Sequence, residues 1–149
     1  MSEWSSLAAV MTDHSPLPYA TELHLDAHGS VFGDAALALY IPLIASSAFP
    51  SLEVLNLGNA GLTDGGLIGL VDALARALAS TGRPLARLDV GGNGHTDAGV
   101  RALAVALADK KVRVREGLVA GGPAVTLAAL EALAVAWKGE KATGAAEVS

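Results

Sequence analysis

The 149-residue sequence has no cysteine, two residues each of Trp, Tyr and Phe, and a charged fraction of 17%. Without cysteine, disulfides, thiolate catalysis and cysteine-ligated zinc are excluded, and so is a small disulfide-bonded secreted scaffold. The shortage of aromatic residues argues against a core built on large rings. The chain instead contains 30 Ala and 23 Leu. This composition indicates many thin, similar layers, and internal repeats are therefore expected.

Positive charge is also scarce, with 10 Lys and Arg against 15 Asp and Glu and a formal net charge of −5. Such a chain has no general attraction for a phosphate backbone, so we expect no direct contact with nucleic acid. The stretch Met1–Val10 holds no Lys or Arg, which is unlike a secretory or mitochondrial signal. The uncharged stretch Ala35–Leu52 is interrupted by Pro42 and Pro50 and is not expected to cross a membrane. We predict a soluble, intracellular, cytoplasmic protein.

The chain repeats itself with a period of 33 residues. Residues 52–57 (LEVLNL) match residues 85–90 (LARLDV), and residues 62–66 (LTDGG) match residues 95–99 (HTDAG). The first part of each copy alternates apolar and polar residues, which predicts a short strand, and the second part opens an apolar pattern of helical period. Thr63 and Thr96 stand where helix N-caps are expected.

Two degraded copies flank this pair. Upstream, residues 22–26 (ELHLD) predict a strand, and a helix follows from Asp34, with a kink or early stop expected at Pro42. Downstream, residues 111–115 (KVRVR) predict a fourth strand, followed by a helix whose first turn includes Pro123. The alternation therefore predicts four β-α units.

The motifs at 52–66 and 85–99 resemble the ribonuclease-inhibitor-like class of leucine-rich repeats, whose pattern is LxxLxLxxNxLxDxG. The resemblance implies an α/β fold, a right-handed horseshoe (solenoid) of about four β-α repeats with a parallel sheet on its concave side. The turn Asn of the pattern is kept as Asn93 and replaced by Ala60 in the preceding copy. His95 replaces a consensus Leu in a buried row, so we expect a hydrogen-bonded interior His95 or a gaping turn.

We predict one leucine-rich-repeat domain over residues 1–138, with an N-terminal cap at 1–20 and repeats at 21–138. Part of the cap, around 6–11, is expected to cover the open end of the first strand, because an exposed terminal layer invites pairing. Residues 139–149 are small and polar without an apolar period, which predicts a flexible tail.

Catalytic signatures are missing from the sequence. It contains no dinucleotide or phosphate loop, no HExxH and no GxSxG. Glycines 91, 92 and 94 precede a predicted helix as an anion cradle would, but repeat turns explain them better, and Asp97 would repel an anion. Glu22, His24 and Asp26 share a strand face at a spacing of about 7 Å, too wide for three ligands on one ion. We therefore predict no enzyme activity, no cofactor and no metal.

The concave face of the predicted sheet is the remaining candidate site. Residues between the core positions of each strand are expected to point to this face, and their charge changes from acidic in the first strand to wholly basic in the last. A solvated strand face would explain such charges equally simply. As a binding surface it would suit a protein partner with an acidic segment, held chiefly by the basic trio of the last strand. The predicted partner-binding residues are Glu22, His24, Asp26, Asn56, Arg87, Asp89, Lys111, Arg113 and Arg115.

Three functional hypotheses remain open. The first is a non-catalytic protein–protein interaction module that binds through the concave surface. The second is a structural subunit of a large intracellular assembly (cytoskeletal, ciliary or ribonucleoprotein), because four repeats leave apolar ends that partners would cover. The third is a GTPase activator, since Ran GTPase-activating proteins have a similar repeat type, although none of their functional residues can be matched here.

Overall fold

The structure of the protein is a computed structural model that describes residues 3–26, 32–46, 48–138 and 147–148. In this part of the chain, helices and strands alternate. The helices are α1 (Glu3–Asp13), α2 (Gly33–Ala45), α3 (Asp64–Thr81), α4 (Asp97–Ala108) and α5 (Leu127–Lys138). The strands are β1 (Glu22–His24), β2 (Val54–Asn56), β3 (Leu85–Asp89), β4 (Val114–Val119) and β5 (Glu147–Val148).

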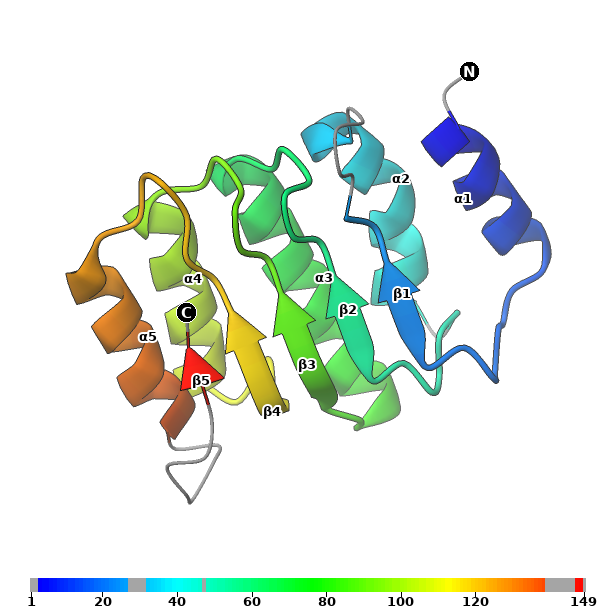
Figure 1. The fold of residues 1–149 in the computed structure, drawn as a ribbon. Coiled ribbons are helices and arrows are strands. Elements are labelled where there is room, and N and C mark those ends of the chain that lie inside the picture. Colours follow the sequence, from blue (N-terminus) through cyan, green and yellow to red (C-terminus); the bar gives the residue numbers. More distant parts are fainter. Residues whose placement is uncertain (1–2, 27–31, 47, 139–146, 149) are drawn as a thin grey trace.

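The strands form one open parallel sheet in the order β1-β2-β3-β4-β5. The helices lie side by side on one face of this sheet, and no described helix or strand covers the other face (Figure 1). Each described β-α unit therefore places its strand and its helix next to those of the preceding unit. The predicted α/β class with a parallel sheet is confirmed.

The core is a set of rows that run across the sheet. Leu23 pairs with Leu55, Leu55 with Leu88, and Leu88 with Leu118, and each of the four is at most 5% exposed. Leu57 and Val90 form the next row and are fully buried. Helix residues one and two turns apart pack on these rows from behind, as the 3.6-residue period predicted. The buried face of α3 is Gly66, Leu67, Leu70, Val71, Ala73 and Leu74.

Helix α1 covers the helical layer rather than the first strand. The Trp4 and Phe32 rings meet edge to face with centroids 4.8 Å apart, and the Tyr40 hydroxyl donates to the Trp4 carbonyl at 2.8 Å. These contacts fix α1 on α2. The predicted cap exists as a helix, but its expected place over β1 is wrong, because Trp4 finds its partners at Phe32, the residue before α2, and at Tyr40 within α2.

The fourth strand is displaced from its predicted position. It runs Val114–Val119 instead of 111–115, and Leu118, not Val112 or Val114, occupies the row of Leu88. Val112 is buried just before the strand, and Val114 is the first residue of the strand and pairs with Leu85. Their period-two pattern therefore marks the start of the strand and not the row of Leu88. A register shift between Leu85 and Arg87 accommodates one extra residue in β4.

The two ends of the last unit also differ from expectation. Helix α5 begins at Leu127, four residues after Pro123, so Pro123 lies in the preceding loop rather than in the first turn. Glu147–Val148, within the predicted tail, pair with β4 as a short parallel strand. Residues 139–146 and 149 of that tail lie outside the described residues.

Candidate functional site

The uncovered face of the sheet brings together side chains from three neighbouring strands. Glu22, Val54 and Arg87 are register partners, and so are His24, Asn56 and Asp89. Alternation along a strand sends these side chains away from the helices while Leu23, Leu55 and Leu88 point inward. Asp26 follows β1 and is partly exposed. The predicted rows of the first three strands are therefore placed on one surface.

A polar chain crosses from β1 to β2 on this surface. His24 Nε2 lies 2.8 Å from Glu22 Oε1, and Asn56 Nδ2 lies 3.4 Å from His24 Nδ1. Because the amide nitrogen of Asn56 can only donate, His24 accepts at Nδ1 and donates from Nε2 to the Glu22 carboxylate. The side chains of Glu22 and His24 are about half exposed, at 57% and 49%. Both therefore remain accessible to a partner from solvent.

The third strand, β3, carries one positive and one negative side chain of this surface, Arg87 and Asp89, two residues apart. The Asp89 carboxylate accepts from the Gly91 amide at 2.9 Å, as the Asn56 side chain does from Gly58 at 2.9 Å. Arg87 reaches across β4: a Cβ on Gly117 would lie 2.5 Å from its Nη1. A side chain at position 117 would therefore displace the Arg87 guanidinium from this place. A shallow hollow of about 150 Å³ opens between these strands.

The basic trio does not form a fourth row of this surface. Lys111 and Arg113 lie in the loop before β4, and only Arg115 is in the strand. The register partners of Arg87 and Asp89 in β4 are Gly117 and Val119. The predicted charge gradient across the sheet is therefore wrong in its last row. The cause is that the sequence places the fourth strand at 111–115, whereas the strand runs Val114–Val119, as described above.

The basic residues instead gather at the edge of the sheet where the strands begin. Arg115 lines an open hollow together with Glu53 and Arg83, and Arg83 lines a second pocket together with Arg113. The Arg83 Nη2 lies 3.9 Å from Glu53 Oε1, with both side chains about half exposed. The sequence interpretation missed Arg83. The available signal was its position in the loop before β3, because residues 111–113 lie in the corresponding loop before β4.

The opposite edge, where the strands end, is built from a repeated contact. The first-turn aspartate of one helix accepts the backbone N–H and the hydroxyl of the threonine that starts the next helix. The pairs are Asp34 with Thr63, Asp64 with Thr96, and Asp97 with Thr126. We call these three pairs the Asp–Thr ladder. Thr63 and Thr96 occupy the N-cap positions as predicted. Only the Thr96 hydroxyl accepts a capping hydrogen bond, from Ala98 N at 3.3 Å, whereas both hydroxyls link neighbouring units.

The ladder explains a glycine of the repeat and two lowered pKa values. A Cβ on Gly99 would lie 2.6 Å from Asp64 Oδ1, so the aspartate needs glycine to approach the next helix. The hydroxyl and the amide of Thr96 lower the pKa of Asp64, and the amide and hydroxyl of Thr126 lower the pKa of Asp97. In the fourth unit Leu127 follows the threonine, where the earlier units have aspartate. The ladder therefore ends at Thr126.

Two buried polar side chains stabilise the turns at this edge. The Asn93 Oδ1 accepts from Ala60 N at 2.8 Å and Leu62 N at 3.1 Å, while its amide donates to the carbonyls of Leu57 and Val90. One asparagine thus serves the preceding turn, where Ala60 lacks a polar side chain. His95 is fully buried and its Nε2 donates to Ala120 O at 2.7 Å, which confirms the expected hydrogen-bonded interior histidine.

Within the described residues, no three His, Asp or Glu side chains are grouped closely enough to hold a metal ion. None of the described helices has the length and apolarity needed to cross a membrane. Comparison of the chain with protein-family models and with curated proteins found no match.

Proposed function

We propose that the chain is a leucine-rich-repeat module of the ribonuclease-inhibitor-like class that binds another protein and catalyses no reaction. Three observations support the repeat assignment. Matched positions recur at a spacing of 33 residues. The Asp–Thr ladder and the Asn93 side chain join one unit to the next through hydrogen bonds. A horseshoe-like stack of this kind is stabilised by contacts between neighbouring units.

The observation that carries the binding function is the bare face of the parallel sheet. Parallel sheets are usually covered by helices on both faces, whereas the helices in the described part of this chain all lie on one face (Figure 1). The exposed face presents the Glu22–His24–Asn56 chain beside Arg87 and Asp89. Both charge signs and several hydrogen-bonding groups on one rigid surface suit recognition of a folded protein or a peptide.

Site-specific photo-crosslinking tests this function. A benzoylphenylalanine at position 56 lies on the sheet face, and one at position 105 lies on the exposed side of α4 as a matched control, since Val105 is 56% exposed. We expect position 56 to capture the same discrete protein repeatedly from a native extract, and position 105 to capture none. Crosslinks from position 105 alone would place the binding surface on the helices.

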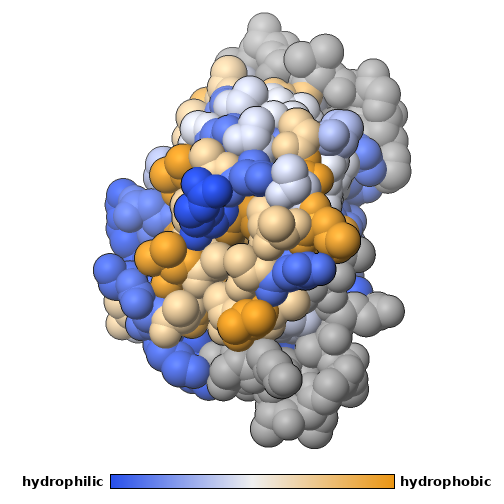
Figure 2. Space-filling model, turned by 90° about the vertical axis from the view of Figure 1, so that its left-hand side faces the viewer, coloured by the Kyte–Doolittle hydropathy of each residue, from blue (hydrophilic) through white to orange (hydrophobic). Residues whose placement is uncertain are grey.

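An assembly subunit is the second candidate, and the α5 end of the molecule favours it. Leu127 and Val135 of α5 are 72% and 73% exposed, and this end of the molecule shows apolar patches broken by hydrophilic side chains (Figure 2). Apolar surface of this kind marks a contact with a partner. Light scattering after size-exclusion chromatography separates the two: a stable monomer supports the interaction module, and an obligate oligomer supports the assembly subunit.

A further inference from the structure

The helices that cover the sheet differ in length in a way that opens a pocket. When they are aligned on the aspartates of the Asp–Thr ladder, α2 and α4 end at positions equivalent to Ala75 of α3. Helix α3 continues to Thr81 and closes at Gly82, which has a positive φ of 69° and donates to Leu78 O. Its last turns therefore project beyond both neighbours, at the edge where the strands begin.

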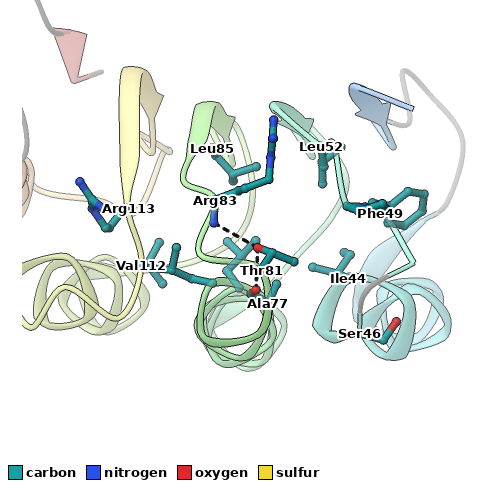
Figure 3. A pocket seen from close by; sticks show the side chains of 13 residues that line it. Ile44, Ser46, Phe49, Leu52, Ala77, Thr81, Arg83, Leu85, Val112 and Arg113 are labelled. Atoms are coloured by element: carbon teal, nitrogen blue, oxygen red, sulfur yellow. Dashed lines mark hydrogen bonds between the residues drawn. The ribbon is translucent and has the colours of Figure 1, made fainter. Parts of the chain in front are cut away.

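The pocket lies against this projecting end of α3. Ala77, Leu78 and Thr81 of α3 form one wall, and Ile44, Leu52 and Val112 form others. Figure 3 shows the apolar side chains around the end of α3, with Arg83 and Arg113 on the side of the strands. The hydroxyl of Thr81 donates to Ala77 O at 2.9 Å and accepts from Arg83 N at 3.2 Å, so the turn that carries Arg83 is fixed.

The size of the pocket restricts what it can hold. Its volume is about 40 Å³, well below the roughly 150 Å³ of a cavity that accepts a benzene ring. The space suits the branched tip of an aliphatic side chain rather than an aromatic ring. An apolar occupant is favoured because the lining is mainly aliphatic.

The charge beside the pocket has the opposite sign to that of the whole chain. Arg83 and Arg113 line the pocket itself, Arg115 lines the adjoining hollow, and Lys111 is exposed two residues before Arg113. Among the described residues that line these two hollows, Glu53 is the one acidic side chain. On a chain of net charge −5, this local excess of cations attracts an acidic segment, and arginine holds carboxylates in a bidentate geometry.

We propose that this pocket binds one leucine-like side chain of an acidic peptide segment, whose carboxylates contact Arg83 and Arg113. The proposal rests on the proposed protein-binding function and assigns to the partner a chemistry and a second contact point away from the sheet face. Apolar burial fixes the register of the segment, and the arginines speed its approach.

Fluorescence anisotropy with three labelled heptapeptides tests the proposal on the full chain. The probes are Asp-Glu-Asp-Leu-Asp-Glu-Asp, the same peptide with Ser in place of Leu, and the same peptide with Trp in that place. We expect the Leu peptide to bind about tenfold more tightly than the Ser or Trp peptide. Equal binding of the Leu and Ser peptides would overturn the apolar part of the proposal.

Variants then locate the contact. Ala77→Phe fills the pocket and should abolish the preference for Leu over Ser, whereas Ala79→Phe, the same change at an exposed site of α3, should preserve it. Arg83→Glu with Arg113→Glu should weaken all three peptides at least about tenfold at low salt, and Arg101→Glu on α4 should weaken none. Loss of the Leu preference in Ala79→Phe, or an unchanged preference in Ala77→Phe, would contradict the assigned pocket.

Two further readouts keep the outcomes distinct. Should Ala77→Phe fail to fold, amide chemical shifts of the parent chain must still change around 77–83 and 112–113 when the Leu peptide is added, and changes confined elsewhere would overturn the proposal. A partner captured from position 56 without any Leu preference leaves the protein-binding function standing and removes the pocket. A Leu preference without such capture keeps the pocket and removes the sheet-face function.

Discussion

The two edges of the sheet are built from the same repeat and behave differently. Where the strands end, the Asp–Thr ladder, Asn93 and His95 join each unit to the next through buried or repeated hydrogen bonds. Where the strands begin, the helices end at unequal positions, a pocket opens and the basic side chains gather. Regular spacing thus stabilises one edge, and departures from that spacing create the candidate binding features of the other.

The largest loss of stability is expected from a substitution in the buried leucine row that crosses the sheet between the two edges. Leu88 is 1% exposed and pairs with Leu55 on one side and Leu118 on the other. Leu88→Ala should lower the free energy of unfolding by about 2–5 kcal/mol, because it removes buried methyl groups and leaves a cavity. Urea denaturation measures the loss. The exposed Ile68→Ala is the control, and an unchanged midpoint for Leu88→Ala would disprove the assigned core row.

At the regular edge, Asn93 should matter more than the neighbouring turn residue Asn59. Asn93→Ala leaves the amides of Ala60 and Leu62 and two carbonyls without their side-chain partner. We expect a loss of about 2–3 kcal/mol in the same denaturation experiment. Asn59→Gly should cost little, since Asn59 is exposed and its φ of 52° is one that glycine adopts readily. Similar losses for both variants would contradict the role of Asn93.

The ladder predicts a dependence of stability on pH. Hydrogen bonds from Thr96 and Thr126 lower the pKa of Asp64 and Asp97 in the folded chain. The stability they contribute is therefore full above the unfolded pKa of about 3.9 and is lost as pH falls through the lower folded pKa. Asp64→Asn with Asp97→Asn should reduce stability at neutral pH and flatten the decline in acid. Denaturation series over the acid range that run parallel for parent and variant would exclude the ladder as a stabilising element.

The irregular edge should tolerate charge reversal with little effect on folding. Arg113→Glu with Arg115→Glu should change the free energy of unfolding by no more than about 1 kcal/mol, because both side chains are exposed. The same variant should slow association with the acidic Leu peptide and flatten its salt dependence. Stopped-flow rates at several salt concentrations measure this effect. Rates indistinguishable from those of the parent would move the acidic contact away from this edge.

The contrast between the edges also marks where sequence interpretation succeeds. The 33-residue repeat predicts β2, β3, the starts of α3 and α4, and the buried row through Leu55 and Leu88, because these positions keep the full pattern. His95 departs from that pattern, but its place in a buried row predicts either a hydrogen-bonded interior histidine or a gaping turn, and the structure shows the former. Thr63 and Thr96 were identified as caps, but their bonds to the aspartate of the preceding unit depend on the stacking of units, which a local pattern does not reveal.

Interpretation fails where the spacing changes. The valines at 112 and 114 alternate with charged residues as a half-buried strand does, yet the pairing begins only at Val114, opposite Leu85, and Leu118 fills the row of Leu88. That shift removes Lys111 and Arg113 from the sheet face. It also brings Arg113 and Arg83 to one pocket from loops that lie far apart in sequence.

Amide hydrogen exchange followed by NMR, with and without the acidic Leu peptide, tests the division between the edges most directly. In the free chain the amides of Ala60 and Leu62, which donate to Asn93, should exchange only through global unfolding, while those of Gly82 and Lys110 exchange through local opening. Added peptide should slow exchange at Gly82 by direct protection, and should slow exchange at Ala60 only as much as binding raises the global free energy of unfolding. Equal protection at the two edges, or slowing confined to the Asn93 turn, would contradict the assignment of stability to one edge and binding to the other.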